Sequence, residues 1–155
     1  MLNIYVDGDS CPVKEEIMRV SLRHGLEMFL VSNKWMPQIM GPKIHKILVQ
    51  AGADAADNWI AEHIEKNDIA ITADILLAQR CIQIGAFVIS PYGKSFTEEN
   101  IGMAVAMRSL SSHLRETGEI SGYNPSFSKQ NSSKFLQILE TTIQKIKLDS
   151  LTRNS

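Results

Sequence analysis

Three short apolar runs in this sequence each deliver an aspartate at or just beyond their end. Asp7 ends the first run, Asp54 and Asp57 follow the second, and Asp74 closes the third. In an open α/β sheet, neighbouring parallel strands bring their carboxyl ends to one edge, and ligands bind in the crevice outside that edge. The spacing therefore predicts a cluster of carboxylates at one crevice.

Carboxylates gathered in this way repel one another unless a positive group lies between them. The simplest such group is a hard divalent cation. Mg2+ takes oxygen ligands and is usually held by one or two carboxylates together with substrate phosphates. The acids therefore indicate phosphoryl-transfer or phosphodiester chemistry that depends on Mg2+ or Mn2+.

Three acids also suit a purely structural role. Asp9 precedes Pro12 at the expected start of a helix, and Asp54 and Asp74 each stand where another helix is expected to begin. Aspartate is among the preferred N-cap residues, because its carboxylate accepts hydrogen bonds from the first backbone N–H groups of a helix. For each of these acids, capping and ligand binding remain alternatives.

Asp7 and Asp57 are harder to explain as caps. Asp7 is the polar end of an apolar strand and has no helix of its own to cap. Asp57 falls on the same helical stripe as Ile60 and Ile64, so its carboxylate interrupts a face that should be buried. A buried carboxylate needs a partner, which a metal ion or a structural lysine would provide.

Strand-like and helix-like patterns alternate along most of the chain. This order is typical of a three-layer α/β/α domain with a mainly parallel central sheet. Strands are expected at about 3–6, 26–31, 45–49, 69–72 and 86–90, and helices from Pro12 to Gly25, at 54–65, at 75–84, at about 98–115 and from 134 onward.

The last third of the chain predicts a different arrangement. The helix at 98–115 carries an apolar stripe, residues 117–133 are rich in Gly, Ser and Asn and predict a long loop, and the helix from 134 is amphipathic. We expect this last helix to dock on the body or on a second subunit in a homodimer. The chain should form one domain over 1–150, with 151–155 frayed. On the helix at 98–115, the expected apolar stripe consists of Met103, Met107, Leu110 and Leu114, widened by Ile101, Ala104 and Val105.

Composition bounds the function without choosing it. The chain has 155 residues, 44% of them hydrophobic, which suffices for one core, and its net charge is −1. Residues 1–107 hold 9 basic and 13 acidic side chains, whereas 108–155 hold 7 and 4. The sequence begins with a strand and has no apolar run of membrane-spanning length. Together with two cysteines that show no metal-ligand spacing, this predicts a cytoplasmic protein that does not bind membranes.

Four ordered segments resemble the YaiI/YqxD family of bacterial proteins of unknown function. They are Val6-Asp-Gly-Asp-Ser-Cys-Pro-Val-Lys14, Gly52-Ala-Asp-Ala-Ala-Asp-Asn-Trp-Ile60, Ile71-Thr-Ala-Asp-Ile75 and Thr97-Glu-Glu-Asn-Ile101. The resemblance covers nearly the whole chain and implies a PIN-like domain, related to metal-dependent nucleases. Carried over by position, it makes Asp7, Asp57 and Asp74 the acidic triad, with Asp9 and Asp54 as outer metal ligands.

Donors around this crevice are expected to position a phosphate. Lys14 follows the first acidic loop, Arg108 shares a helix face with small apolar residues, and Asn33 and Asn100 can donate neutral hydrogen bonds. For each of them, the ordinary role of an exposed or capping side chain is favoured at least as strongly. Trp35, in a loop bounded by prolines, suits base stacking but also suits packing of its own loop.

Three functions are compatible with these residues. The favoured one is a metal-dependent nuclease, with single-stranded RNA as substrate. The second is a PIN-like RNA-binding or regulatory module without turnover. The third is a haloacid-dehalogenase-type phosphatase, in which Asp7 is the nucleophile and Asp9 the general acid. That third chemistry lacks its usual paired acid after Asp74, and Cys11 as an alternative nucleophile lacks the arginine of a phosphate-binding loop.

Overall fold

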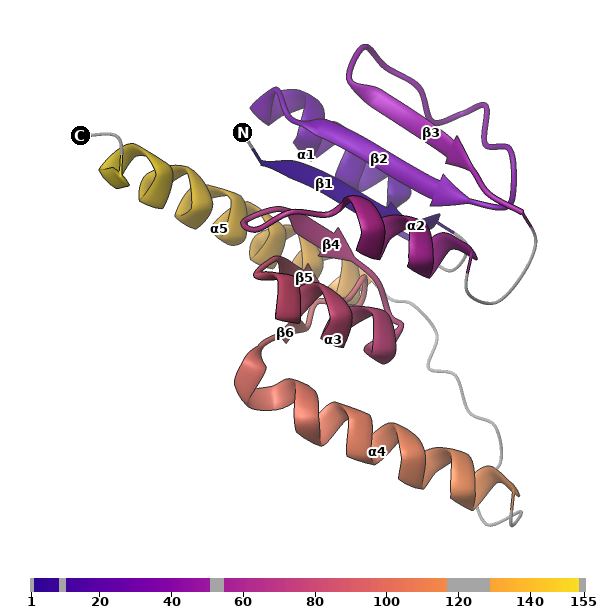
Figure 1. Ribbon diagram of the computed structural model, residues 1–155. Coiled ribbons are helices and arrows are strands. Elements are labelled where there is room, and N and C mark those ends of the chain that lie inside the picture. The colour runs from indigo at the N-terminus through magenta and orange to yellow at the C-terminus, as the bar shows by residue number, and fades with distance from the viewer. Residues whose placement is uncertain (1, 9–10, 51–54, 117–128, 154–155) are drawn as a thin grey trace.

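The structure is a computed structural model that describes residues 2–8, 11–50, 55–116 and 129–153, with backbone only for 108–116 and 152–153. Strands and helices alternate through the first half, except that a loop joins the second and third strands, as the sequence predicts (Figure 1). In chain order the elements are β1 (Asn3–Asp7), α1 (Lys14–His24), β2 (Glu27–Ser32), β3 (Ile44–Leu48), α2 (Ala55–His63), β4 (Ile69–Ile71), α3 (Ile75–Ile84), β5 (Phe87–Ile89), β6 (Ser95–Phe96), α4 (Glu98–Glu116) and α5 (Lys129–Arg153).

The strands form one sheet in the order β3-β2-β1-β4-β5-β6. All neighbouring pairs are parallel except β5 and β6. The chain moves outward from β1 to β3, returns across the sheet through α2, and continues outward in the opposite direction from β4. The direction of winding therefore reverses between β1 and β4, which makes their carboxyl ends the topological switch point of the sheet.

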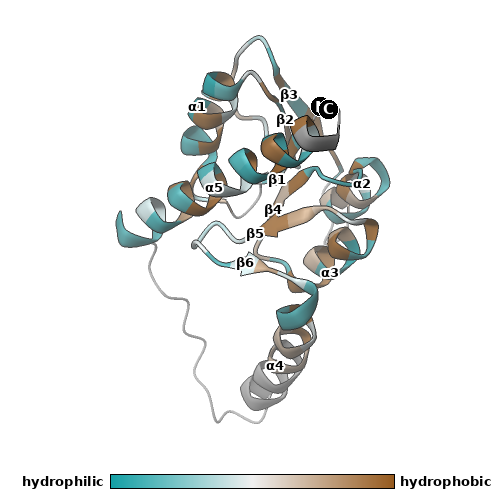
Figure 2. Ribbon diagram, turned by 90° about the vertical axis from the view of Figure 1, so that its left-hand side faces the viewer, coloured by the Kyte–Doolittle hydropathy of each residue, from teal (hydrophilic) through white to brown (hydrophobic). Residues whose placement is uncertain are grey.

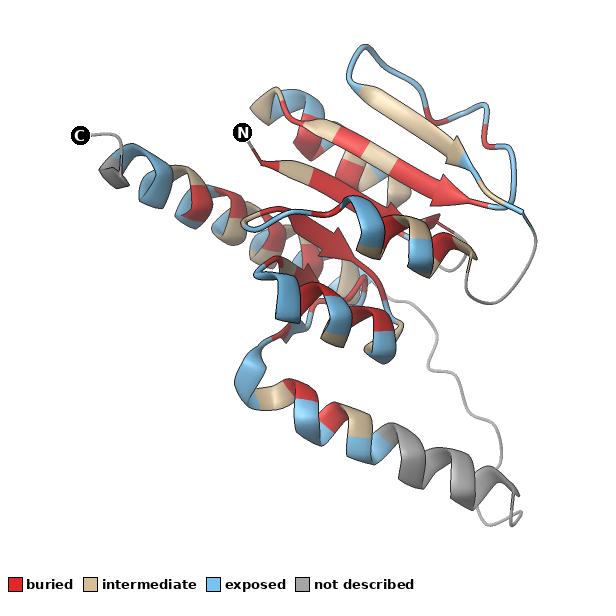
Figure 3. Ribbon diagram, in the orientation of Figure 1, coloured by how far each residue is buried: buried red, intermediate tan, exposed pale blue. Residues whose placement is uncertain are grey.

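Helices cover both faces of the sheet, which confirms the predicted three-layer α/β/α class. Figure 2 shows the sheet nearly edge-on, with α1 and α5 on one side and α2 and α3 on the other. Side chains alternate between the faces along β1: Ile4 and Val6 join the core under α1 and α5, and Tyr5 joins the core under α2 and α3. The central strands are accordingly buried along their length, whereas β3 at the edge is half-buried (Figure 3).

The first helix begins without a capping side chain. Val13 occupies the N-cap position of α1 and makes no side-chain capping bond. Asp9, for which capping was one expectation, lies outside the described residues. The helix ends at Gly25, whose φ of 67° is the left-handed conformation that glycine adopts most readily.

Element boundaries differ from the predictions mainly in the last third of the chain. The two-residue strand β6 is absent from the predicted pattern. The helix α5 begins at Lys129, five residues before its expected start, and continues through Arg153, beyond the expected domain end at 150. Residues 117–128 of the expected loop lie outside the described residues. Within the described part, no helix has the length and apolar character needed to cross a membrane.

The predicted apolar stripe of α4 is wrong in its orientation. Met103 and Met107 are 70% and 53% exposed, whereas Ile101 and Ala104 are buried. Small and branched side chains allow α4 to approach α3 closely, so these residues form the contact and the longer methionines face outward. The side chains of the other two stripe positions, Leu110 and Leu114, lie outside the described residues.

The helix α5 docks on the body of the same chain, as one of the two predicted alternatives states. Phe135, Leu139 and Ile143 are fully buried and belong to the core beneath α1 and β1. Such burial contributes about 2 kcal/mol for each large apolar side chain. The C-terminal helix is therefore part of the domain and completes one of its two outer layers.

A polar contact also joins α5 to α1. The carboxylate of Glu140 accepts a hydrogen bond from Arg23 and lies 2.6 Å from His24 Nε2. Burial alone would raise the pKa of Glu140, but the bonds from His24 and Gln144 and the charge of Arg23 outweigh it and hold that pKa below its ordinary value. The charged carboxylate is thus the form that this contact favours.

We predict that Phe135→Ala destabilises the protein by about 3–5 kcal/mol, because it removes a fully buried ring and leaves a cavity between α5 and the sheet. Leu151→Ala is the matched control in the same helix. Leu151 is 69% exposed, so its truncation should change stability by less than about 0.5 kcal/mol. Urea unfolding followed by circular dichroism measures both, and equal effects would contradict the docking of α5.

Candidate functional site

Polar side chains line the carboxyl edge of the sheet, where its central strands end. The strand registers place Asp7, Thr72 and Ser90 level with one another, directly after the last paired apolar residues of β1, β4 and β5. Ser32 follows Val31, the partner of Asp7 on β2. We call Ser32, Asp7, Thr72 and Ser90 the carboxyl-edge row. It spans four neighbouring strands and includes both sides of the topological switch point.

The three hydroxyl groups of this row have the same local geometry. Each is almost fully buried, with 2–6% of the residue exposed. Each accepts a hydrogen bond from the backbone N–H two residues further on, which turns the chain out of the strand. The bonds run from Lys34 N to Ser32 Oγ (3.0 Å), from Asp74 N to Thr72 Oγ1 (3.0 Å) and from Tyr92 N to Ser90 Oγ (3.1 Å).

Thr72 connects two of the predicted acids. Its hydroxyl donates to Asp7 Oδ2 at 3.1 Å and accepts from the backbone N–H of Asp74 at 3.0 Å. Because the hydroxyl is buried, these two bonds fix both its rotamer and its proton direction. The structure therefore places Asp7 and Asp74 on either side of one threonine at the switch point.

Asp74 also caps α3, which was one of the two roles expected for it. Its Oδ1 accepts hydrogen bonds from Leu76 N at 2.9 Å and from Leu77 N at 3.2 Å. Both bonds fall on the same oxygen. Asp74 is half-buried at the start of the helix, so its carboxylate is held in a fixed orientation at the carboxyl edge.

Asp57 lies in the first turn of α2, which begins at the same edge of the sheet. It is half-buried, and Ile60 and Ile64 on the same stripe are buried, as predicted. Burial raises the pKa of Cys81 in α3, and the charge of Asp57 adds to this rise. The same two helices are joined by Arg80, which donates to Asn58 Oδ1 at 2.9 Å.

The donor set at this edge suits a hard cation but does not form a closed cage. In the described ranges, no group of three or more His, Cys, Asp or Glu side chains is placed to hold a metal ion. The outer ligands expected at Asp9 and Asp54 lie outside those ranges. Carboxylates on Asp7 and Asp74 fit a Mg2+ or Mn2+ ion that takes the rest of its shell from water and substrate phosphate.

Lys14 closes the loop that follows β1. Its Nζ donates to Cys11 O at 2.6 Å and to Gly8 O at 3.3 Å. The ammonium group therefore binds the backbone carbonyls of one residue on either side of positions 9 and 10. Gly8 passes close to β2, and a Cβ at this position would lie 2.8 Å from Leu30 Cδ1.

The other three predicted phosphate donors have different outcomes. Asn33 is exposed at the end of β2, next to the carboxyl-edge row. Asn100 does not belong to the site, because the antiparallel strand β6 carries the chain back toward the opposite edge before α4 begins. The side chain of Arg108 lies outside the described residues, although its backbone continues α4.

Asn100 instead caps its own helix. Asn100 Oδ1 accepts from Thr97 N at 2.8 Å, and Asn100 N donates to Thr97 Oγ1 at 3.2 Å. This reciprocal pair is a capping box, in which the third residue of the helix and the N-cap residue satisfy each other's backbone donors. The spacing Thr-Glu-Glu-Asn resembles the usual signature, in which Glu or Gln stands three positions after Ser or Thr, with Asn100 in that place.

Neither cysteine suits nucleophilic catalysis. Cys11 and Cys81 are free and buried. Burial raises the pKa of Cys11 to about 11 and that of Cys81 to about 12, so both thiols are protonated at neutral pH. Because the thiolate is the reactive form, these protonated thiols are poor nucleophiles.

The hydroxyl groups of the carboxyl-edge row were not predicted from the sequence. The available signal was the repetition of one pattern, an apolar strand followed by Ser or Thr, at Ser32, Thr72 and Ser90. Hydroxyl residues at strand ends commonly form turns with their own backbone, which makes the pattern weak for any single strand. Its recurrence at three strands that share one edge is what gives it meaning.

We predict that Asp74→Ala lowers the stability of the protein by about 1 kcal/mol, because it removes the N-cap of α3. Asp74→Asn should change stability by only a few tenths of a kcal/mol, because asparagine caps as well as aspartate. Thermal unfolding of both variants in chelator measures the difference. Equal losses in both variants would mean that the charge of Asp74, and not its capping bonds, stabilises the fold.

Comparison with known proteins places the chain in a family. A family model described as "Uncharacterized BCR, YaiI/YqxD family" matches residues 5–145. A UPF0178 protein of Agrobacterium fabrum is 51% identical over 144 residues, which are 93% of this chain and 94% of the relative. A UPF0178 protein of Rhizobium meliloti is 50% identical over 144 residues, covering 93% and 99%. One from Parvibaculum lavamentivorans is 48% identical over 147 residues, covering 95% and 97%. This chain therefore belongs to the YaiI/YqxD family.

Proposed function

We propose that this protein is a PIN-like, cytoplasmic nuclease that cleaves single-stranded RNA with the help of Mg2+ or Mn2+. The observation that supports the proposal is that the Thr72 hydroxyl binds both the Asp7 carboxylate and the backbone N–H of Asp74 at the switch point of a parallel sheet. Ligand sites of open α/β sheets lie at this point, because the flanking loops diverge there and leave a crevice.

The charge and chemistry of the site favour a phosphodiester substrate. Oxygen donors without histidine or thiolate select Mg2+ or Mn2+ over softer metals. A bound cation would act as a Lewis acid and neutralise the charge that develops on the scissile phosphate. The carboxylates alone would repel a phosphate, so a cation between them is also what makes the site accessible to a nucleic acid.

The chain's own groups have separable roles in this proposal. Asp7 and Asp74 hold the cation, and Asp57 contributes from α2, with Asp9 and Asp54 as outer ligands. Thr72 holds Asp7 in one orientation through its buried hydroxyl. Asn33 and Lys14 stand beside the carboxyl-edge row, where each can position a phosphate oxygen.

A second function, RNA binding or regulation without turnover, is favoured by one observation. Asp74 is already engaged as a helix cap through two backbone N–H groups. In a binding module, the carboxyl-edge row would contribute only the shape and charge of the binding surface. The phosphatase alternative gains no similar support, because the first turn of α3 after Asp74 contains no second acid.

We predict that the purified protein cleaves labelled single-stranded RNA in the presence of Mg2+ or Mn2+. Asp7→Asn and Asp74→Asn should each reduce the rate by more than about 100-fold, since they weaken cation binding. Asp149→Asn is the matched control, because Asp149 is exposed in α5 and away from the carboxyl-edge row. The rates are measured by denaturing gel electrophoresis.

Two outcomes of this assay would contradict the nuclease. Intact RNA over a broad panel of sequences, combined with tight binding, would establish the non-catalytic module. Release of phosphate from small phosphomonoesters without RNA cleavage would establish the phosphatase. Because Asp74→Asn preserves the cap, its loss of activity cannot be attributed to unfolding of α3.

We also predict that Mg2+ or Mn2+ raises the melting temperature of the parent protein relative to chelator. A ligand that binds the folded state stabilises it by about 2.7 kcal/mol when present at 100 times its dissociation constant. Asp7→Asn should lose most of this increase, and Asp57→Asn should lose part of it if Asp57 is a ligand. An equal increase in all variants would place the cation elsewhere.

A further inference from the structure

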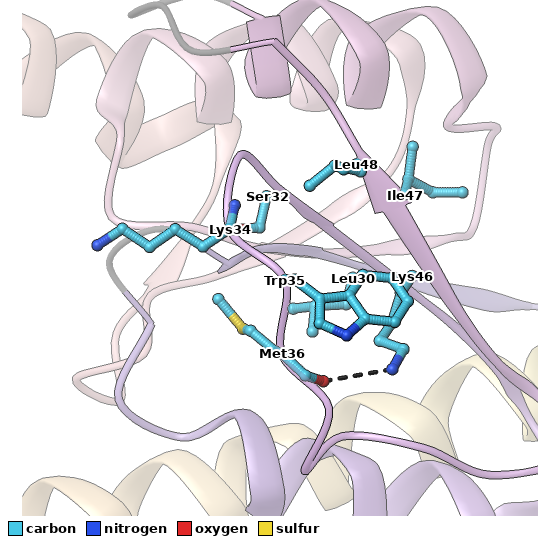
Figure 4. Close-up of a pocket in the computed structure, with 8 residues that line it drawn as sticks. All are labelled: Leu30, Ser32, Lys34, Trp35, Met36, Lys46, Ile47 and Leu48. Carbon is cyan, nitrogen blue, oxygen red and sulfur yellow. Dashed lines mark hydrogen bonds between the residues drawn. The ribbon is translucent and has the colours of Figure 1, made fainter.

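A tryptophan is displayed beside the carboxyl-edge row and is not used by the core. Trp35 lies in the loop 33–43 that follows β2, and 65% of it is exposed. The Nζ of Lys46 lies 4.2 Å from the centroid of its ring, and the same atom donates to Met36 O at 3.3 Å. Figure 4 shows this arrangement, with the ammonium group of Lys46 held by the Met36 carbonyl.

This contact orients the indole. The cation covers one face of the ring, and Lys46 is itself held by β3 and by its bond to the loop. The large exposure of Trp35 therefore belongs mainly to the opposite face and to the ring edge. A planar group is thus presented to solvent in a fixed direction.

The charge around Trp35 is positive, although the front half of the chain is acidic. Between Glu27 and Asp54 the sequence contains no acidic residue, and its charged side chains are Lys34, Lys43 and Lys46. Lys43 lies at the opposite end of β3 and donates to Gly25 O. The other two lysines flank the tryptophan: Lys34 precedes it in the chain, and Lys46 contacts its ring. The side chain of Lys34 extends away from the ring (Figure 4).

The platform lies at the same edge of the sheet as the proposed catalytic acids. Trp35 is three residue steps beyond Ser32 in the chain, so their Cα atoms lie within about 11 Å of each other. Ser32 belongs to the carboxyl-edge row on the strand next to Asp7, about 5 Å away across the sheet. A single strand of about 4–16 nucleotides, the usual span of one binding fold, can contact both places.

We propose that Trp35, Lys34 and Lys46 form a binding platform for single-stranded nucleic acid, on which one base stacks on the open face of the indole while lysine neutralises the adjoining phosphates. The inference rests on the proposed function, because it supplies the substrate-binding surface of the same site. Bases in a duplex are already stacked on one another, so an exposed indole selects strands with an unpaired base.

Binding is tested without cleavage, in chelator and at low salt, by fluorescence anisotropy of labelled RNA and DNA strands of about 12 nucleotides. Trp35→Leu should weaken binding about 5- to 100-fold, and Trp35→Phe, which keeps an aromatic face, should retain most of the affinity. Lys34→Gln should reduce the slope of log affinity against log salt by about 0.7. Binding of either strand type with this dependence supports the platform, and a matched duplex should bind with no dependence on Trp35.

Two controls come from the same molecule. Met40 is 66% exposed in the same loop but has no aromatic face, so Met40→Ala should bind as the parent does. Lys66 is exposed in the turn before β4, at the amino edge of the sheet, so Lys66→Gln should leave the salt slope unchanged. Melting curves confirm that each variant is folded.

The inference is wrong if Trp35→Leu binds single strands as tightly as the parent. It is also wrong if that variant dissociates a dimer while its affinity for nucleic acid is unchanged, since the surface would then be a protein interface. Trp35-dependent binding without any cleavage in Mg2+ or Mn2+ would support the platform and refute the nuclease. Cleavage of RNA at the same rate by the parent and by Trp35→Leu would support the nuclease and refute the platform.

Discussion

A sheet that is buried on both faces can place polar groups only at its edges, and this constraint governs the molecule. The centres of β1 and β4 are closed to solvent, so the first polar side chains after them, Asp7 and Thr72, come level at the carboxyl edge. Thr72 must satisfy its hydroxyl there, and it does so with Asp7 and the N–H of Asp74. Because a buried hydroxyl must be hydrogen-bonded, Thr72 connects two of the residues that the proposed cleavage would use.

The strands and the first three helices could be predicted because their patterns are local. Each apolar run and the residue that bounds its element are neighbours in the sequence, as with Gly25 at the end of α1 and Asp74 at the start of α3. The last third of the chain, from β6 onward, was predicted less well. The strand β6 depends on pairing with β5, and apolar residues occur on two sides of α4, so periodicity alone does not decide whether Ile101 or Met103 faces α3.

The candidate site shows the same division between local and non-local information. The proximity of Asp7 and Asp74 could be inferred from strand ends and the rule for parallel sheets. The hydroxyl of Thr72 between them could not, since a threonine at a strand end usually serves only its own turn. Asn100 was misplaced because two residues of antiparallel strand move the chain to the opposite edge, and no local pattern reports such a reversal.

The two edges of the sheet use their acids differently, and the contrast separates structure from function. At the amino edge, Asp68 is buried and commits both carboxylate oxygens to backbone, with Oδ1 accepting from Asn3 N and Oδ2 from Glu65 N. Burial raises the pKa of Asp68, and these two bonds oppose that rise. Asp74 at the carboxyl edge accepts both of its capping bonds on Oδ1 and is only half-buried. An acid that serves only the fold engages both oxygens in the interior. Asp74, by contrast, uses one oxygen as a helix cap at the switch point, the part of an open α/β sheet where ligands bind.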